Sequence, residues 1–297
     1  MAERVRLDTE LVRRGLARSR RHAGELIASG RVSVDGSPTA KVSTALDPGQ
    51  VLEVEVRPGA APEFASRAGH KLAGALDALA APEEQGGPVV RGRTCLDAGA
   101  STGGFTDVLL RRGAAHVFAI DVGHDQLVPE LRADPRVTVR EGLNARHLSA
   151  GQFEPAPGLV VGDLSFISLT LVLPALVEVA APGADLLLLV KPQFEVGREA
   201  LGPGGVVRSP QLRAGAVLAV ARAAGALGLR TRAVVASVLP GPSGNVEYFV
   251  WLAADPGATS PEPRTAPADG DLIALIDRAV AAGPTGEGTG WTSGGDQ

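Results

Sequence analysis

The sequence predicts an α/β protein in which a doubly wound, mostly parallel sheet follows a small α+β domain. Three observations support this prediction. Short apolar segments alternate with helical patterns through residues 94–253, as strands joined by crossover helices do. A glycine-rich turn at 97–104 follows the first of these strands. The first 45 residues carry a net charge of +4, whereas the whole chain carries −4.

The N-terminal segment has the pattern of a small mixed domain. Two helical patterns, at 7–17 and 20–30, precede a strand-turn-strand pattern at 31–42. Within the last pattern, Asp35-Gly36 is a hairpin signal.

Arginines are concentrated in this segment, and five of them fall within residues 13–21. We expect a basic face that neutralises nucleic-acid phosphates rather than arginines that pair locally. The alternative is an ordinary solvated helix face. The candidate RNA-binding residues are Arg4, Arg6, Arg13, Arg14, Arg18, Arg20 and Arg21.

Residues 94–106, TCLDAGASTGGFT, predict a strand, a glycine turn and the start of a helix. Such a turn lets the backbone approach a ligand, and the helix N-terminus offers unpaired N–H groups. The glycine spacing fits neither a dinucleotide nor a phosphate-loop motif, and the turn lacks Lys and Arg, so we expect an adenosine compound without phosphates. The candidate ligand-binding residues here are Asp97, Gly99, Ala100, Ser101, Thr102, Gly103, Gly104 and Phe105.

Further strands are predicted at 116–121, 137–141, 159–163, 184–192, 229–237 and 246–253, with helices at 169–181 and 209–227. Ligands of such sheets bind at the carboxyl ends of the strands, which singles out Asp97, Asp121, Asp163 and Lys191, because each closes a predicted strand. Asp121 has the position of an acid that binds ribose hydroxyls, and a helix-capping role is the alternative. Asn144 follows the third strand as a candidate for the adenine edge or as a simple turn residue.

Two lysines and two carboxylates form a second candidate set. Asp163 and Lys191 stand at strand ends, Glu247 stands at the entrance of the last strand, and Lys71 lies near the start of a helix at 66–80. A lysine that closes an apolar run needs a partner, because burying an unpaired ammonium is costly. A purely structural ion pair is the alternative.

The motifs SRAGHKL, LDAGASTGGFT, DLSFISL, LVKPQFE, GPGGVV and GPSGNVEYF resemble, in order, those of the TlyA (hemolysin A) family of ribosomal RNA 2′-O-methyltransferases. Residues 6–36 resemble an S4 RNA-binding domain. The resemblance implies a Rossmann-like S-adenosylmethionine methyltransferase domain of the FtsJ/RrmJ type. It also implies that S-adenosyl-L-methionine is the cofactor and that the acceptor is a cytidine 2′-hydroxyl of ribosomal RNA within ribosomal subunits.

By the same resemblance, Lys71, Asp163, Lys191 and Glu247 match the family's catalytic tetrad. Arg4 and Arg6 resemble the longer family variety that acts on both 16S and 23S ribosomal RNA. Relatives of that variety carry an R-A-W-V segment before the first motif, where this chain has PEFA, with Phe64 in the place of the tryptophan.

The reaction suggests a role for Lys191 and for one further residue, Phe166. Lys191 is expected to act as a base or to orient the 2′-oxygen, since a ribose hydroxyl is a poor nucleophile. Phe166, in the loop after Asp163, either stacks on the target base or packs the loop.

Four segments are expected: an S4-like domain at 1–56, a linker at 57–65, the methyltransferase domain at 66–254 and a tail at 255–297 that is disordered outside a small helix at 271–282. The single cysteine, the charged N-terminus and the interrupted apolar stretches predict a cytoplasmic monomer with no metal and no stable membrane association. The alternatives are an RNA-binding protein that holds cofactor without methyl transfer, a membrane-active haemolysin and a nicotinamide dehydrogenase.

Overall fold

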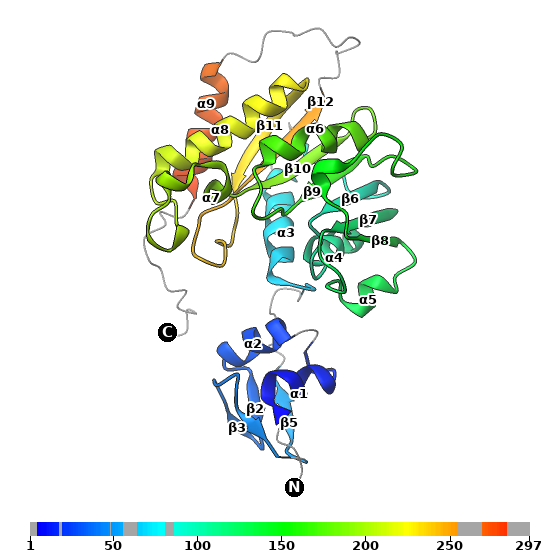
Figure 1. Cartoon of the computed structure of the whole chain (residues 1–297), viewed down its shortest axis with the longest axis vertical. Coiled ribbons are helices and arrows are strands. Elements are labelled where there is room, and N and C mark those ends of the chain that lie inside the picture. Colours follow the sequence, from blue (N-terminus) through cyan, green and yellow to red (C-terminus); the bar gives the residue numbers. More distant parts are fainter. Residues whose placement is uncertain are drawn as a thin grey trace. The chain divides into compact units, whose positions relative to one another are not determined.

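The computed structural model describes residues 5–17, 20–47, 49–55, 64–80, 86–254 and 269–283. The chain forms two compact units, Met1–Ser66 and Arg67–Gln297 (Figure 1). The predicted linker before residue 64 and most of the predicted tail lie outside the described residues.

The first unit packs two helices against short strands. Its elements are β1 (Val5–Arg6), α1 (Leu7–Arg13), α2 (Arg20–Ala28), β2 (Val32–Val34), β3 (Ser37–Pro38), β4 (Ala45–Leu46) and β5 (Leu52–Val54). β2 lies between β3 and β5, and β1 pairs with β4. Asp35 and Gly36 join β2 to β3 with φ of 49° and 77°, so the predicted hairpin turn is confirmed. Leu7, Leu11 and Ile27 form the centre of its core.

The second unit is built on a seven-stranded sheet in the order β11-β12-β10-β9-β6-β7-β8. The strands are β6 (Thr94–Ala98), β7 (His116–Asp121), β8 (Val137–Glu141), β9 (Leu159–Gly162), β10 (Asp185–Val190), β11 (Leu229–Ala236) and β12 (Tyr248–Ala254). β6 to β10 pair in parallel, and β12 is antiparallel to both of its neighbours. The order reverses at β6, where β7 and β9 lie on opposite sides, and such a point is where open α/β sheets bind ligands.

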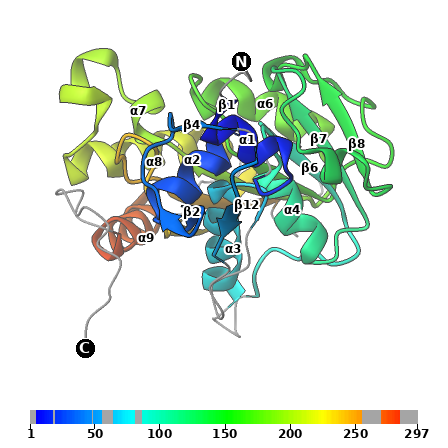
Figure 2. The same ribbon diagram turned by 90° about the horizontal axis from the view of Figure 1, so that it is seen from below.

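Helices cover both faces of this sheet (Figures 1 and 2). They are α3 (Arg67–Ala80), α4 (Gly104–Arg111), α5 (Pro129–Arg132), α6 (Leu169–Val179), α7 (Pro192–Glu195), α8 (Pro210–Ala226) and α9 (Asp269–Ala282), with 3-10 turns η1 (Ala145–His147), η2 (Arg198–Ala200) and η3 (Pro203–Gly205). α6, α8 and α9 share one apolar core with Leu96, Phe118 and Val160 of the strands. α3 and α4 lie side by side, and Phe105 of α4 packs on Phe249 of β12.

The predicted doubly wound α/β fold is confirmed, and each predicted strand is present within two residues of its expected ends. One detail is wrong, because Asp97 lies inside β6 and Ala98 is the residue that ends the strand. Asp121 is the last residue of β7, and Asp163 and Lys191 directly follow β9 and β10.

The C-terminal helix α9 joins the core of the second unit. It lies against α8 and β11 (Figure 1), and its buried side chains include Leu272 and Ile276. No helix in the described part of the chain is both long and apolar enough to cross a membrane.

Replacing Ile276 by Ala should lower the free energy of unfolding by about 2–5 kcal/mol, because it leaves a cavity in a packed core. Ile276 is 1% exposed, whereas Ile273 on the same helix is 39% exposed, so Ile273→Ala is the matched control. That control should cost less than about 1 kcal/mol. Urea unfolding measures both, and equal small losses would mean that α9 is not part of the cooperative core.

Candidate functional site

The glycine turn between β6 and α4 has a backbone that other residues do not readily adopt. Gly99 and Gly103 have φ of 85° and 97°, and a Cβ at Gly99 would lie 3.0 Å from the backbone oxygen of Asp163. The N–H groups of Gly99 and Ala100 bond to the carbonyl of Ile120 at 2.9 and 3.0 Å. The turn is therefore fixed at the end of β6, next to the ends of β7 and β9.

Asp121 fastens this turn with both carboxylate oxygens. Oδ2 accepts a bond from the N–H of Ser101 at 2.8 Å, and Oδ1 accepts one from the N–H of Gly123 at 2.7 Å. Ser101 adopts a left-handed φ of 47°, which the bond to Asp121 helps to hold. A carboxylate has about four lone-pair sites, so Asp121 retains acceptor capacity for ribose hydroxyls.

Asp97 lies beneath the turn and is fully buried. Burial, with smaller contributions from the nearby acids Asp163 and Asp121, raises the pKa of its carboxyl group to about 7, although hydrogen bonding to Thr106 opposes the shift. Thr106 Oγ1 donates to Asp97 Oδ2 at 2.7 Å, and Asp97 Oδ1 has no hydrogen-bond partner among the described atoms. Asp97 is thus an acid with one unsatisfied acceptor under the glycine turn.

The other predicted ligand-binding residues lie at the start of α4, in the glycine turn and at the start of η1. Gly104 and Phe105 begin α4, and the ring of Phe105 belongs to the core, so its side chain does not line the turn. Ala100 is buried, and Thr102 follows Ser101 in the turn, with its carbonyl accepting from Val128 N at 3.4 Å. Asn144 caps η1, where its Oδ1 accepts from the N–H of Arg146 at 2.9 Å.

The predicted lysine and carboxylate set forms two ion pairs. Lys71 Nζ lies 2.5 Å from Glu247 Oε2, and the two side chains are 5% and 0% exposed. Lys191 Nζ lies 2.7 Å from Asp163 Oδ1, and these side chains are 10% and 17% exposed. Each buried ammonium therefore has a carboxylate partner, as its desolvation requires.

Strand register brings the two pairs to one edge of the sheet. Val190 of β10 pairs with Tyr248 of β12, so Lys191 and Glu247 stand just beyond the same end of these two strands. Asp163 leaves the adjacent strand β9 at the same edge. The glycine turn ends the next strand, β6, so the turn and the ion pairs share the carboxyl edge of the parallel strands.

Two residues that the sequence analysis did not single out contact this set, and a third, Glu195, bonds outside it. Ser165 Oγ accepts a hydrogen bond from Lys191 Nζ at 2.7 Å. Gln193 Nε2 lies 3.5 Å from Glu247 Oε1. Glu195 bonds to the start of α6. Their proximity in the motifs DLSFISL and LVKPQFE was the available signal, but motif position alone does not tell which polar side chains face one another.

The arginines of the first unit surround two covered acids. Asp8 accepts from Arg6 and Arg20 at 3.0 Å, and Glu10 accepts from Arg13 at 2.5 Å and from Arg14 at 2.7 Å. Bonding to the arginines lowers the pKa of both carboxyl groups to about 2. The expectation that these arginines do not pair locally is therefore wrong.

Pairing does not remove the guanidinium groups from the surface. The side chains of Arg6, Arg13 and Arg20 are 51%, 68% and 63% exposed, whereas Asp8 and Glu10 are 5% and 6% exposed. Arg4 and Arg18, and the side chain of Arg21, lie outside the described residues.

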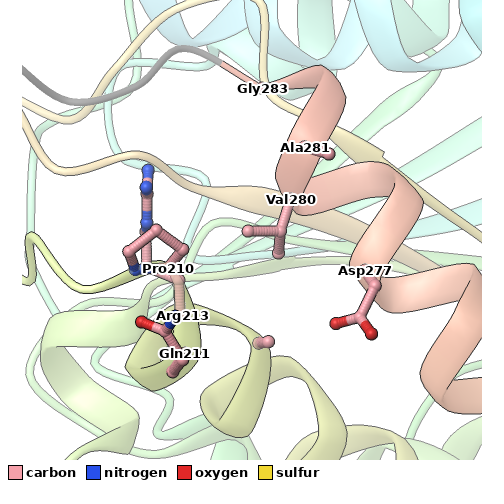
Figure 3. A pocket seen from close by; sticks show the side chains of 8 residues that line it. Pro210, Gln211, Arg213, Asp277, Val280, Ala281 and Gly283 are labelled. Atoms are coloured by element: carbon pink, nitrogen blue, oxygen red, sulfur yellow. The ribbon is translucent and has the colours of Figure 1, made fainter.

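A cavity of about 340 Å³ lies elsewhere, between α8 and α9 (Figure 3). It shares no lining residue with the glycine turn or the ion pairs. The residues that line it are Pro210, Gln211, Arg213, Ala214, Asp277, Val280, Ala281 and Gly283. Among the described residues, no group of three or more His, Cys, Asp or Glu side chains is arranged to hold a metal ion.

Comparison with protein families gives two matches. An S4 domain matches residues 5–52, and an FtsJ-like methyltransferase domain matches residues 64–254. These matches define the class of protein, a methyltransferase with an N-terminal S4 domain.

Individual relatives extend the match to nearly the whole chain. The 16S/23S rRNA (cytidine-2′-O)-methyltransferase TlyA of Mycobacterium tuberculosis is 55% identical over 284 residues, which cover 96% of this chain and 100% of that protein. Of the solved structures, a protein described as a hemolysin from Streptococcus thermophilus is 32% identical, with a TM-score of 0.69 over 94% of this chain and 96% of that one. Another from Lactococcus lactis is 36% identical, with a TM-score of 0.63 over 72% and 97%. The chain belongs to the TlyA family.

The raised pKa of Asp97 predicts how stability depends on pH. Between about pH 4 and about pH 7 the folded chain binds more protons at this group than the unfolded chain, so the free energy of unfolding falls as pH rises through that window. Asp97→Asn removes this loss, so the variant should gain stability relative to wild type as pH rises, measured by urea unfolding at several pH values.

Asp134→Asn is the control for this prediction, because hydrogen bonds from Arg136 lower the pKa of Asp134 instead of raising it. Its variant should show no such relative gain. A pH-independent difference between Asp97→Asn and wild type would contradict the assignment of the raised pKa to Asp97.

Proposed function

We propose that this chain transfers a methyl group from S-adenosylmethionine to cytidine 2′-hydroxyls of ribosomal RNA in both ribosomal subunits. The observation that carries the proposal is the pair of buried lysine–carboxylate contacts at the same sheet edge as the glycine turn. The high identity to a relative named for both 16S and 23S ribosomal RNA supports the dual acceptor.

The groups around the turn fit the cofactor. Gly99 and Gly103 allow the positive φ of the turn, Asp121 offers acceptors for ribose hydroxyls, and Asp97 Oδ1 is an unsatisfied acceptor for a cationic group. Asn144, which caps η1 after β8, is the candidate for the adenine edge. When bound, S-adenosylmethionine supplies a methyl group that its sulfonium already activates.

The protein then has to place the acceptor oxygen and manage one proton. Lys191 Nζ, which lies 2.7 Å from Asp163 Oδ1, is placed to donate a hydrogen bond that orients the 2′-oxygen, and the Asp163 carboxylate is the nearby proton acceptor. Lys71 and Glu247 form the second ion pair. Gln193, in the same segment as Lys191, contacts Glu247 and so connects the two pairs. These contacts support the orienting role of Lys191.

Phe166 is proposed to stack on the target base. Its side chain is 91% exposed, its φ is 63°, and it lies in the loop that follows Asp163. An aromatic ring held outward at the acceptor edge suits a base better than it suits core packing.

The first unit is proposed to hold ribosomal RNA through its arginines. Asp8 and Glu10 fix the guanidinium groups of Arg6, Arg13, Arg14 and Arg20 while three of these four remain mostly exposed. An oriented arginine loses less conformational freedom when it meets a phosphate than a mobile one does. Action on ribosomal RNA implies that the protein works in the cytoplasm.

Mapping 2′-O-methyl positions on both ribosomal RNAs tests the function. Ribosomal subunits that lack the modification are incubated with the purified protein and methyl-labelled cofactor, and each RNA is analysed separately. One cytidine in each subunit supports the proposal. Methylation of a base, or cofactor binding without transfer, would overturn it, and leakage of liposomes by the pure protein would favour the haemolysin alternative.

Lys191→Ala should abolish methyl transfer while the affinities for S-adenosylmethionine and RNA stay within about threefold of wild type, because the change removes only the group that orients the 2′-oxygen. Single-turnover transfer and isothermal titration measure the two effects. Arg278→Ala removes an exposed cation on α9 and should leave both unchanged. Near-normal turnover in Lys191→Ala would remove the residue from the mechanism.

Arg20→Ala should weaken RNA binding and reduce the slope of log affinity against log salt by about one, because one phosphate contact is lost. Filter binding to ribosomal RNA at several salt concentrations gives the slope, with Arg278→Ala again as the control. An unchanged slope would mean that Arg20 does not contact RNA phosphate and only pairs with Asp8.

A further inference from the structure

Glu195, at the end of α7, has contacts that the proposed mechanism does not use. Its Oε1 accepts the backbone N–H of Leu169 at 2.8 Å, and its Oε2 accepts from Ser168 Oγ at 2.5 Å. Ser168 and Leu169 begin α6, so one carboxylate joins the segment after β10 to the segment after β9.

The loop at residues 163–168, which we call the acceptor loop, carries half of the candidate acceptor site. It presents Asp163 and Ser165 to Lys191 at 2.7 Å each, and Phe166 to Phe194 with ring centroids 5.1 Å apart. At one end the loop continues from β9. At the other end Glu195 holds it.

The acceptor loop needs such a restraint. Phe166 has a left-handed φ of 63°, a conformation that costs a non-glycine residue about 1–3 kcal/mol and persists only when its surroundings enforce it. Lys191 and Phe194 contact residues in the middle of the loop, whereas Glu195 fixes the point where the loop enters α6.

A simple helix cap does not account for Glu195. α6 already has a cap, because Ser168 Oγ accepts the N–H of Thr170 at 3.2 Å. Burial raises the pKa of the Glu195 carboxyl group, so the protein keeps this acid in a site that disfavours its charge. An apolar residue would avoid that cost but could make neither bond to α6, so the two bonds are a reason for a polar side chain at this position.

We propose that Glu195 is a positioning residue for methyl transfer, which clamps the acceptor loop so that Asp163 and Ser165 meet Lys191. This inference rests on the proposed function. Glu195 itself does not touch the reacting atoms. It acts through the loop, so its loss should lower the rate of transfer while leaving the affinity for cofactor intact.

Three variants separate the clamp from a structural role. Glu195→Ala removes both bonds. Glu195→Gln retains them, because the amide oxygen accepts from Leu169 and the amide nitrogen donates to Ser168 Oγ. Ser209→Ala is the matched control: Ser209 Oγ caps α8 by accepting the N–H of Leu212 at 3.3 Å, far in sequence from the ion pairs.

Each variant is measured for kcat and KM of transfer to ribosomal RNA, for the dissociation constant of S-adenosylmethionine, and for Tm. Glu195→Ala should lose about tenfold or more in kcat, since small misplacements of aligned groups cost up to about a hundredfold. Its cofactor affinity should stay within about twofold. Glu195→Gln should recover most of kcat. Ser209→Ala should lower Tm by about as much as Glu195→Ala does, but with kcat unchanged.

Hydrogen exchange of the amides of residues 163–168 provides a readout that does not depend on activity. Glu195→Ala should speed this exchange, and Glu195→Gln should not. The clamp is overturned if exchange is unchanged, if kcat of Glu195→Ala equals that of Ser209→Ala, or if Gln rescues no better than Ala. Failure of the wild type to methylate RNA would instead overturn the proposed function. If Glu195→Ala does not fold, the exchange test uses Ser168→Ala, which removes the bond to Glu195 Oε2 together with the cap on Thr170 N–H.

Discussion

The buried contact between Lys71 and Glu247 is the constraint on which the arrangement of the candidate site, at the carboxyl edge of the parallel strands, depends. The two residues lie 176 positions apart, on α3 and at the entrance of β12, and their side chains are 5% and 0% exposed. Transfer of each ion from water costs several kcal/mol, and removal of one partner leaves the other charge buried and unpaired. The contact therefore holds α3, the first helix of the second unit, against the start of β12. Stability alone gives little reason to keep such a pair, since apolar residues of the same volume often serve as well. Its location at the carboxyl edge of the parallel strands, where cofactor and acceptor are proposed to bind, gives a chemical reason to keep the pair.

From this contact the rest of the edge can be followed outward. Glu247 is packed so closely that a Cβ at Gly241 would lie 2.5 Å from its Oε1, which leaves the carboxylate few alternative orientations. β12 pairs with β10 in antiparallel fashion, and Lys191 directly follows β10. Lys191 in turn holds Asp163 and Ser165. Backbone pairing positions β12 and β10 relative to each other. The acceptor loop, by contrast, is held in place by side-chain contacts. A site built mainly on strands holds its groups more precisely than one built on loops.

Sequence reasoning predicted the strands well for a physical reason. Central strands such as β9 and β10 are buried on both faces, so they appear as continuous apolar runs whose ends are marked by polar residues. The same logic identified Asp121, Asp163, Lys191 and Glu247, because charged residues at the ends of buried strands are easily seen. It misplaced Asp97 at a strand end, since a buried acid followed by Ala98 has no mark that distinguishes it from one that closes the strand. A fully buried carboxyl group is a feature of packing, which the local sequence does not encode.

The arginines of the first unit show a different limit. Their number and spacing predicted a basic face, but not that Asp8 and Glu10 lie beneath it, because both acids have the sequence context of an ordinary helix start. Pairing through space depends on how α1 and α2 meet, and Arg20 reaches Asp8 across 12 positions. The covered acids reduce the net charge of the face, yet they also direct the guanidinium groups. A surface so arranged gives up some long-range attraction in return for defined geometry, which fits the proposed binding of ribosomal RNA better than it fits non-specific binding of any polyanion.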